Sequence, residues 1–376
     1  MRFANSPSPS CRSVLHALVR LCRPPLQAGS RQTHADRYVK RYPSSAFALA
    51  LISYFALGLH SLRQLKTYLD CDARLYKVLG LHGISEAQLP KLLHRRPPEL
   101  WEPLVAALLQ RLPRGQVPAQ VRVMDSSFFH LGLKLLSRQM ARRFTPESAG
   151  VKLTLIMEPE TGAPHAWLVT VGQGTDMPSG VALCASQEDI RGHLYIFDRG
   201  YRKYAFWGSL IERGADFLTR GEADARYTVL ETRPLPPLPG EILSDQIVRL
   251  GSKEARNLLA PPVRRIVKRT PHEDLIFLTS LFDLPAGEVA ELYRTRWQIE
   301  LLFRWLKRTL ACTKPLGYSP AAAAHTFYAA LVYYLLILLV AHASGRPRRL
   351  QKIVYEMQAG LHERPEIRHL QAFGFL

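Results

Sequence analysis

The chain has 376 residues, of which 47% are hydrophobic and 22% charged, a composition typical of a folded protein that excludes a fibrous or wholly disordered one. Its 50 Lys and Arg residues against 31 Asp and Glu give a formal net charge of +19, which favours a nucleic acid partner over an acidic protein or a membrane surface. Five scattered cysteines without a CxxC pair argue against a disulfide framework or a structural zinc site, and favour a reducing compartment.

The first segment, residues 1–35, contains no acidic residue and five arginines. This composition is that of a transit peptide, but no apolar core with a small-residue cleavage site follows it. We therefore expect a disordered basic arm, or an over-extended start, ahead of the folded chain.

Helical periodicity begins near residue 36 and continues to residue 114, for example in SSAFALALISYFALGLHSLRQL. It predicts a helical N-terminal domain, which we expect to bind DNA. Within it, LHGISEAQLPKLLHRR predicts a turn and a helix, with Ser85 as N-cap and Gln88 completing a capping box. Such a helix could lie in a major groove or be an ordinary helix of a bundle. In the first case the side chains directed at phosphate would be Lys91, His94, Arg95 and Arg96.

The period changes to that of strands at residue 117. In VPAQVRVMDSSFF, apolar and polar residues alternate up to Asp125, which predicts a strand. The elements expected after it are two strands joined by a turn at 160–162, a helix, a strand ending on Asp198, a second helix and a short strand. This order predicts an α/β domain with a mixed sheet and flanking helices. Residues 222–285, rich in proline and short apolar runs, predict a β-rich insertion.

A long apolar run, FYAALVYYLLILLVAHA at residues 327–343, is about 17 residues long, at the short limit for crossing a bilayer. We expect a helix packed inside the protein, with a membrane span as the less favoured alternative. Residues 346–376 predict a basic C-terminal tail or helix.

Three carboxylates occupy chemically suggestive places: Asp125 and Asp198 near strand ends, and Glu300 in the helix after the insertion. Burying three unpaired carboxylates together is costly, and divalent cations remove that cost. Mg²⁺ prefers oxygen ligands, and two ions about 4 Å apart can promote phosphodiester chemistry. Taken singly, Asp198 could instead be a turn or cap residue, and Glu300 an ion-pair partner of a neighbouring arginine.

YRTRWQIELLFRWLKRTL, residues 293–310, predicts one continuous helix around Glu300. At about 100° per residue, Tyr293, Arg296, Glu300 and Lys307 fall within about 60° of one another, beside the apolar face. A surface helix held by ion pairs does not need this alignment, so the stripe favours a site.

The spacing Tyr293-x2-Arg296-x3-Glu300-x6-Lys307 resembles the YREK signature of the insertion-sequence 4 family of DDE transposases. VMDSS and YIFDRGY resemble the segments that carry this family's two aspartates, and KLTLIMEPETGAPHAWLVTVGQGTD resembles the hairpin between them. The resemblance covers about residues 36–345.

The resemblance implies a ribonuclease-H-like catalytic domain at residues 117–345, with the β-rich insertion at about 222–285. It implies that Asp125, Asp198 and Glu300 are catalytic ligands of two Mg²⁺ ions, for which Mn²⁺ can substitute. It further implies that Arg296 and Lys307 hold phosphates and that Tyr293 contacts the DNA backbone.

As a function, the resemblance implies binding of double-stranded DNA at the terminal inverted repeats of an insertion sequence, followed by cleavage and strand transfer. The protein would act as a homodimer in a synaptic complex in the cytoplasm of a prokaryote, without a membrane. A hairpin route would require an aromatic side chain to hold a flipped base, for which Trp207 and Trp297 are candidates. The alternatives are a catalytically inactive or domesticated DNA-binding protein and a stand-alone nuclease.

Overall fold

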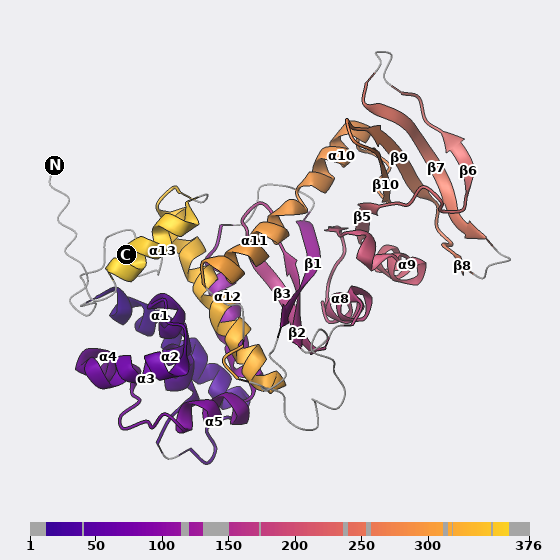
Figure 1. Ribbon diagram of the computed structural model, residues 1–376. Helices are drawn as coiled ribbons and strands as arrows, with labels where there is room; N and C mark the ends of the chain where they lie inside the picture. Colours follow the sequence, from indigo (N-terminus) through magenta and orange to yellow (C-terminus); the bar gives the residue numbers. More distant parts are fainter. Residues whose placement is uncertain are drawn as a thin grey trace, which may run out of the picture.

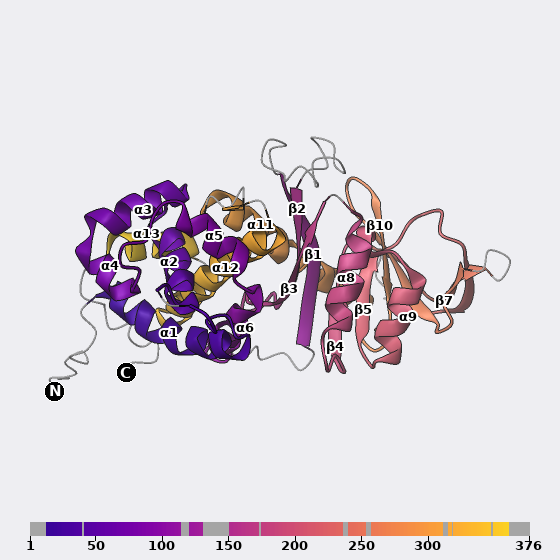
Figure 2. The same ribbon diagram turned by 90° about the horizontal axis from the view of Figure 1, so that it is seen from below.

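The computed structural model describes residues 13–39, 41–113, 120–130, 150–172, 174–235, 240–252, 257–310, 315–317, 319–346 and 349–360. In these residues, a group of helices lies on one side of a single large sheet, and a long helix, α12 (Pro320–Ala343), lies between them (Figure 1). Figure 2 shows the same arrangement from below.

The helical part of the chain precedes the sheet. Its elements are α1 (Val14–Gln32), α2 (Ser44–Ala56), α3 (Leu62–Cys71), α4 (Ala73–Leu79), α5 (Gln88–Arg95), the 3₁₀ helix η1 (Pro98–Trp101) and α6 (Glu102–Leu109). These elements confirm the helical periodicity expected from residue 36 onward.

Helix α1 corrects the expectation of a disordered arm. Ser13 caps it by accepting from the His16 N–H, and its apolar stripe is buried against α2, α6 and η1. Gly29 allows a close approach, because a Cβ there would lie 2.1 Å from the Leu100 carbonyl oxygen. The unusual composition of residues 1–35 hid this amphipathic stripe. Residues 1–12 lie outside the described part of the chain.

Helix α12 confirms the prediction of a buried core helix. It is long and apolar enough to cross a membrane, but 89% of its most apolar stretch is buried inside the protein. It packs against α2, α5, α6 and β3, and the Tyr334 hydroxyl donates to the Gly162 carbonyl in the turn before β3. One hydrophobic core therefore runs from α1 through α12 to the sheet. Helix α13 (Leu350–Ala359) packs on α12 and forms part of the expected C-terminal segment; residues 361–376 lie outside the described part.

The sheet contains every strand of the described chain. Its strands are β1 (Gln120–His130), β2 (Gly150–Met157), β3 (Pro164–Val171), β4 (His193–Ile196), β5 (Asp216–Arg220), β6 (Tyr227–Thr232), β7 (Ile242–Ser252), β8 (Asn257–Leu258), β9 (Val263–Arg269) and β10 (Asp274–Thr279). The order is β3-β2-β1-β4-β5-β10-β9-β7-β6, with β8 paired to β7. β1 runs antiparallel to β2 and parallel to β4, and β4 runs parallel to β5. The predicted mixed sheet is confirmed.

The strands expected in residues 222–285 form, but they do not make a separate body. β10 pairs with β5 on one side and β9 on the other, so the insertion continues the same sheet (Figure 1). Between β7 and β9, the Arg264 guanidinium pairs with the Asp245 carboxylate through two hydrogen bonds of 2.8 and 2.6 Å. Arg264 also donates to carbonyls at 281, 282 and 284, which fixes the approach to the next helix.

Helices cover both faces of the sheet. α8 (Asp176–Ala185) and α9 (Tyr204–Glu212) pack on one face, and α11 (Trp297–Arg308) and α12 on the other (Figure 2). Successive side chains of β1 point to opposite faces of the sheet. Val123 is part of the hydrophobic core under α12, and Met124 is part of the core under α8 and α9.

The helix expected from Tyr293 to Leu310 is divided. α10 (Ala286–Arg294) ends before Thr295, and α11 begins at Trp297. The N–H groups of Thr295 and Arg296 bond to carbonyls three residues back, as in a 3₁₀ turn. Thr295 contributes to this tightening, because its hydroxyl donates to the Leu292 carbonyl. Both junction residues keep right-handed helical angles, so α11 continues the course of α10 (Figure 1).

Candidate active site

Asp125 and Asp198 lie level with each other, beyond the last pair of the ladder between β1 and β4. Asp125 lies in the middle of β1, which stays paired with β2 up to His130, so the expectation that it stands near the end of a strand was wrong. The parallel ladder ends at the pair Val123–Ile196, and each aspartate is two residues further along its own chain. The Asp198 carboxylate also accepts from the Gly200 N–H at 2.9 Å and caps the short 3₁₀ turn η3 (Arg199–Tyr201). The capping alternative for Asp198 is therefore realised, and it leaves the second carboxylate oxygen for other contacts.

Arg296 joins the third carboxylate to this site. Its guanidinium lies 2.5 Å from a Glu300 oxygen and 3.5 Å from an Asp125 oxygen. The same guanidinium lies over the Tyr293 ring, 5.8 Å from its centroid. The ion-pair alternative for Glu300 is thus also realised, with Asp125 as a further partner, although the two carboxylates are 175 positions apart in sequence.

Burial makes negative charge costly at this site. Desolvation raises the pKa of Asp125 to about 7, and the charges of Asp198 and Asp176 add to the rise against the opposing effects of Ser126 and Arg296. Burial likewise raises the pKa of Asp198. Within the described ranges, no three His, Cys, Asp or Glu side chains lie close enough to share one metal ion, and Arg296 lies between two of the candidates. The carboxylate oxygens are donors of the kind that a divalent cation prefers, but in the described residues the three acids do not form one ligand set.

Tyr293 and Lys307 occupy the two ends of the predicted stripe. Tyr293 packs on the Phe277 ring with centroids 5.3 Å apart, and burial raises its pKa. The Lys307 ammonium lies 4.8 Å from the Phe129 ring centroid, and burial lowers its pKa. Because Asp125 and Phe129 both belong to β1, the stripe follows this strand from Arg296 to Lys307.

A fourth carboxylate, Asp176, was missed by the sequence analysis. It begins α8 and accepts from the Lys152 ammonium at 2.7 Å. A Cβ on Gly200 would lie 3.0 Å from an Asp198 oxygen and 3.4 Å from an Asp176 oxygen, so the two carboxylates flank this glycine. The available signal was Lys152, the single charged residue of a fully buried strand.

The two tryptophans considered for holding a flipped base differ in exposure. Trp207 is 1% exposed, donates to the Tyr201 carbonyl and stacks on Phe217 in the core. It is therefore a structural residue, and its candidacy was wrong. Trp297 is 48% exposed, with the Arg304 guanidinium 5.5 Å from its ring centroid.

Helix α5 presents only part of the basic face expected for phosphate contacts. Lys91, His94 and Arg95 are exposed. Arg96 donates instead to the carbonyls of Ala35 and Tyr42, at 2.6 and 3.0 Å, so its assignment to phosphate was wrong. Only one of the two hydrogen bonds expected of the capping box is found: the Gln88 side chain accepts from the Ser85 N–H. Helix α5 begins at Gln88 itself, so Ser85 is not its N-cap.

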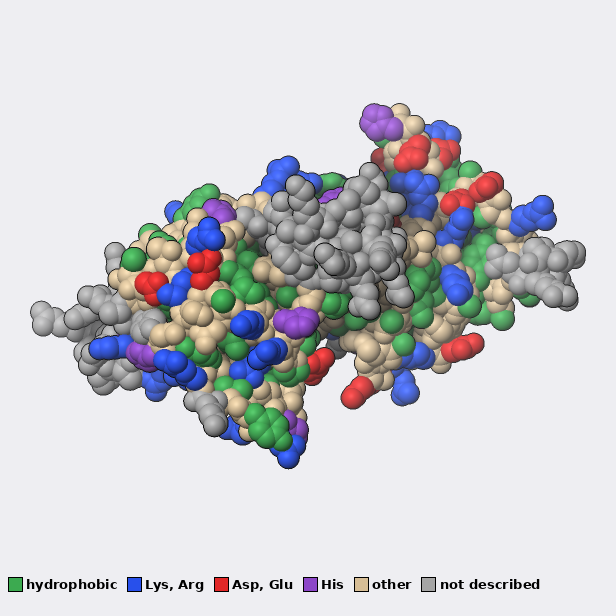
Figure 3. All heavy atoms as spheres, turned by 60° about the horizontal axis from the view of Figure 1, so that its bottom comes forward, with side chains coloured by type: hydrophobic (Ala, Val, Ile, Leu, Met, Phe, Trp, Pro, Cys, Tyr) green, Lys and Arg blue, Asp and Glu red, His purple; other side chains and the backbone are tan. Residues whose placement is uncertain are grey.

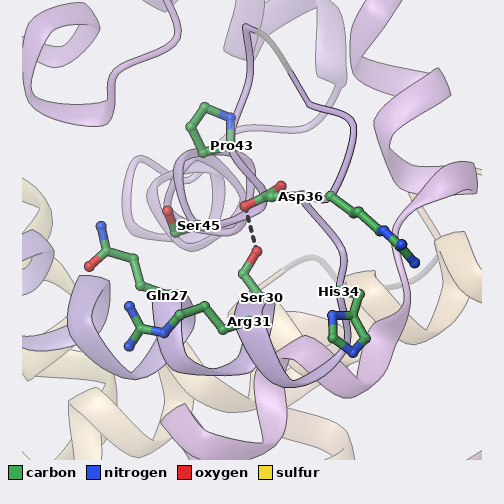
Figure 4. Close-up of a pocket in the computed structure, with 8 residues that line it drawn as sticks. Gln27, Ser30, Arg31, His34, Asp36, Pro43 and Ser45 are labelled. Atoms are coloured by element: carbon green, nitrogen blue, oxygen red, sulfur yellow. Dashed lines mark hydrogen bonds between the residues drawn. The ribbon is translucent and has the colours of Figure 1, made fainter.

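A second basic surface, also missed, surrounds a cavity of about 790 Å³ between α1 and α2 (Figure 4). The Asp36 carboxylate accepts from Ser30 and Ser44 and is used to hold these two helices together. Within the described part of the chain, no ion pair joins Arg31 or Arg37 on the cavity rim to a carboxylate. On the face shown in Figure 3, Lys and Arg side chains gather over the helical half of the molecule.

Comparison with known proteins identifies the family of the chain. Residues 117–336, more than half of the chain, match the family described as the transposase DDE domain. A Sinorhizobium fredii protein, y4zB, named as a candidate transposase, is 32% identical over 63% of this chain and 65% of its own length. A Geobacillus stearothermophilus protein, named as a candidate transposase for the insertion sequence element IS5377, is 25% identical over 81% of this chain and 80% of its own length.

Among solved structures, a cryo-EM structure of the piggyBac transposase synaptic complex with hairpin DNA aligns with 95% of this chain and 82% of that chain. Its sequence identity is 12% and its TM-score 0.49, so this likeness carries no weight here. The family match rests on the sequence comparisons: the chain belongs to the transposase DDE domain family.

Proposed function

We propose that this protein is a transposase of the insertion-sequence 4 type, which binds the terminal inverted repeats of its element and catalyses metal-dependent cleavage and strand transfer. The observation that carries this proposal is the position of the Arg296 guanidinium, which pairs with both Asp125 and Glu300 beside Asp198. The three acids come from strand β1, the turn after β4 and helix α11, which are far apart in the sequence. The first relative matches over just under two thirds of its own length, so its printed name does not by itself decide the reaction.

The strand order of β1 to β5 supports the ribonuclease-H-like core that the family resemblance implies. Its order is β3-β2-β1-β4-β5, in which the first three strands alternate in direction and the last two run parallel to β1. Asp198 follows the carboxyl end of β4, and Asp125 lies level with it on the neighbouring parallel strand β1, which continues to His130.

Asp125, Asp198 and Glu300 would hold two Mg²⁺ or Mn²⁺ ions. When bound, such ions activate an attacking water or 3′-hydroxyl and stabilise the leaving oxygen. Arg296 neutralises two of these carboxylates in the DNA-free protein, and its planar fork of donors equally suits a phosphate. Lys307 lies beside Phe129, four residues further along β1 than Asp125, and would hold a second phosphate; Tyr293 would contact the DNA backbone.

The helical region would supply further DNA contacts. Exposed Lys91 and Arg95 on α5 and Arg31 and Arg37 near α1 are available to phosphates. The partly exposed Trp297 is the remaining candidate for stacking on a flipped base. Such a protein would act as a homodimer on paired element ends, in the cytoplasm of a prokaryote.

A binding-only protein is the second candidate. It is favoured by the separation of the carboxylates around Arg296, since no three acidic side chains of the described chain meet at one point. Such a protein would bind DNA through the same basic surface without cutting it.

A cleavage assay separates these two functions. Purified protein is incubated with a duplex carrying the DNA that flanks its gene, with Mg²⁺ or Mn²⁺, and strand cleavage and joining are followed on denaturing gels. Glu300→Gln removes the proposed ligand, and Glu288→Gln, an exposed residue of α10, is the matched control.

Cleavage by wild type and Glu288→Gln, but not by Glu300→Gln, supports the proposal if all three bind DNA equally. Binding without cleavage by the wild type with either metal favours the binding-only protein. Equal cleavage by Glu300→Gln overturns the role of this residue.

A further inference from the structure

The ladder between β1 and β4 ends before it reaches the two aspartates. Its last pair is Val123–Ile196, so no hydrogen bond of the ladder fixes the separation of Asp125 and Asp198. Catalytic groups need to be held within a fraction of an ångström, which requires support from neighbouring side chains. Another set of contacts must therefore hold these two segments.

Four hydroxyl groups behind the site form one chain of hydrogen bonds. Tyr201, at the end of η3, lies 2.7 Å from the Ser126 hydroxyl, and Ser126 lies 2.8 Å from that of its cross-strand neighbour Thr154. Thr154 donates to Ser179 of α8 at 2.9 Å, and Ser179 donates to the Asp176 carbonyl at 2.9 Å. The chain thus joins η3, β1, β2 and α8.

The direction of every proton in this chain follows from one rule. A hydroxyl has a single O–H to donate. Because Thr154 donates to Ser179, it must accept from Ser126; Ser126 must then accept from Tyr201. Tyr201 is therefore the first donor, and burial raises its pKa, which keeps its proton in place.

The surroundings leave this chain little freedom. Thr154, Ser179 and Tyr201 are buried. A Cβ on Gly180 would lie 2.3 Å from the Tyr201 ring, which shows how closely α8 approaches it, and the Trp207 indole fixes the Tyr201 carbonyl. Ser126 follows Asp125 directly, and Tyr201 lies three residues after Asp198.

We propose that this hydroxyl chain is a positioning device that sets the separation of the segments carrying Asp125 and Asp198. Adjacent strand residues point to opposite faces, so Asp125 faces α11 while Ser126 reaches back to α8. Tyr201 and Ser126 are positioning residues that act through their neighbours. The consequence for cation binding rests on the proposed function, whereas the mechanical coupling of the two segments does not.

The coupling is tested in the full chain without metal by hydrogen exchange measured on peptides covering residues 121–130 and 193–204. Tyr201→Phe and Thr154→Val each remove one hydroxyl, and Thr154→Ser retains it. Tyr204→Phe, which removes a nearby hydroxyl outside the chain, is the matched control. The expected result is faster exchange in both peptides for Tyr201→Phe and Thr154→Val only. Faster exchange confined to residues 193–204 in Tyr201→Phe, unchanged exchange of both peptides in Thr154→Val, or equal changes in Tyr204→Phe, overturns the device.

The second measurement is Mn²⁺ affinity, from the electron paramagnetic resonance signal of the free ion. Loss of a partner behind metal ligands typically weakens binding about tenfold or more, and this is expected for Tyr201→Phe and Thr154→Val. Unchanged affinity in both variants overturns the consequence for cation binding. If wild type and Asp125→Asn bind Mn²⁺ equally poorly while the exchange coupling is found, the proposed function fails and the positioning device stands.

Discussion

Replacement of Asp125 by asparagine is expected to stabilise the metal-free protein at alkaline pH. Burial raises the pKa of Asp125 to about 7 in the folded protein, against an ordinary value of 3.8. Between about pH 4 and 7, the folded protein therefore keeps a proton that the unfolded chain has lost. The free energy of unfolding falls as the pH rises through this window, and the full loss is present above it.

The size of this effect follows from the shift. A difference of about 3 pKa units at 1.36 kcal/mol per unit amounts to about 4 kcal/mol. For a chain of this length that unfolds as one unit, this corresponds to a rise in Tm of about 5 °C. Asparagine has no charge to desolvate, and its side-chain oxygen can still accept from the Ser126 N–H, which lies 2.7 Å from the carboxylate in the wild type.

Thermal unfolding in EDTA at about pH 4 and about pH 8 measures the difference. Asp125→Asn is expected to melt above the wild type at the higher pH and close to it at the lower pH. Asp274→Asn, an exposed residue of β10, is the control and should change neither. A variant that melts below the wild type at about pH 8, or a shift independent of pH, would refute the reasoning.

Three further predictions concern the packing around the site. Gly29→Ala forces a Cβ against a backbone carbonyl at 2.1 Å and should cost about 1–3 kcal/mol or more in thermal unfolding; no change would mean that α1 does not dock as described. Asp245→Ala leaves the buried Arg264 unpaired and should cost about 3–5 kcal/mol in urea unfolding, with most of the loss recovered when Arg264→Met is added; a double variant as unstable as the single one would contradict this. Burial lowers the pKa of His325 to about 4, so the stability that this residue contributes above about pH 6.5 should be lost as the pH falls toward 4. In a pH series of melting curves, His325→Leu should be less stable than the wild type at neutral pH and should lack this acid dependence.

The sequence predicted the order of elements in the sheet-forming half well. Period-two alternation marked β1 up to Asp125, and helical periodicity marked α2, so the presence of these strands and helices follows from local pattern. The helix at residues 14–32 was missed because an arginine-rich composition without acids outweighed an amphipathic stripe. The transposase DDE domain family rests on the match over residues 117–336 and agrees with the family-level resemblance, whereas the narrower YREK assignment stays a prediction.

Side-chain partners could not be read from the sequence. Arg96 lies in a basic run of the kind expected to contact phosphate, yet its guanidinium donates to two carbonyls from turns distant in the sequence. Trp207 is as aromatic as Trp297, yet only one of them is exposed. Such outcomes depend on which segments meet in space, and a single sequence contains no direct record of those contacts.

The sequence by itself determined the residue types of the site: three acids at strand and helix positions, with Arg296 four residues before Glu300. Helical and strand periods are local properties, so the face on which each residue lies follows from spacing. Only the tertiary structure decided that β1 and β4 pair in parallel with Asp125 and Asp198 level, that Arg296 reaches two of the acids, and that Asp176 and a chain of buried hydroxyls stand behind them. Strand register and close packing depend on the whole core, because a buried polar group must find its partner wherever the fold supplies one.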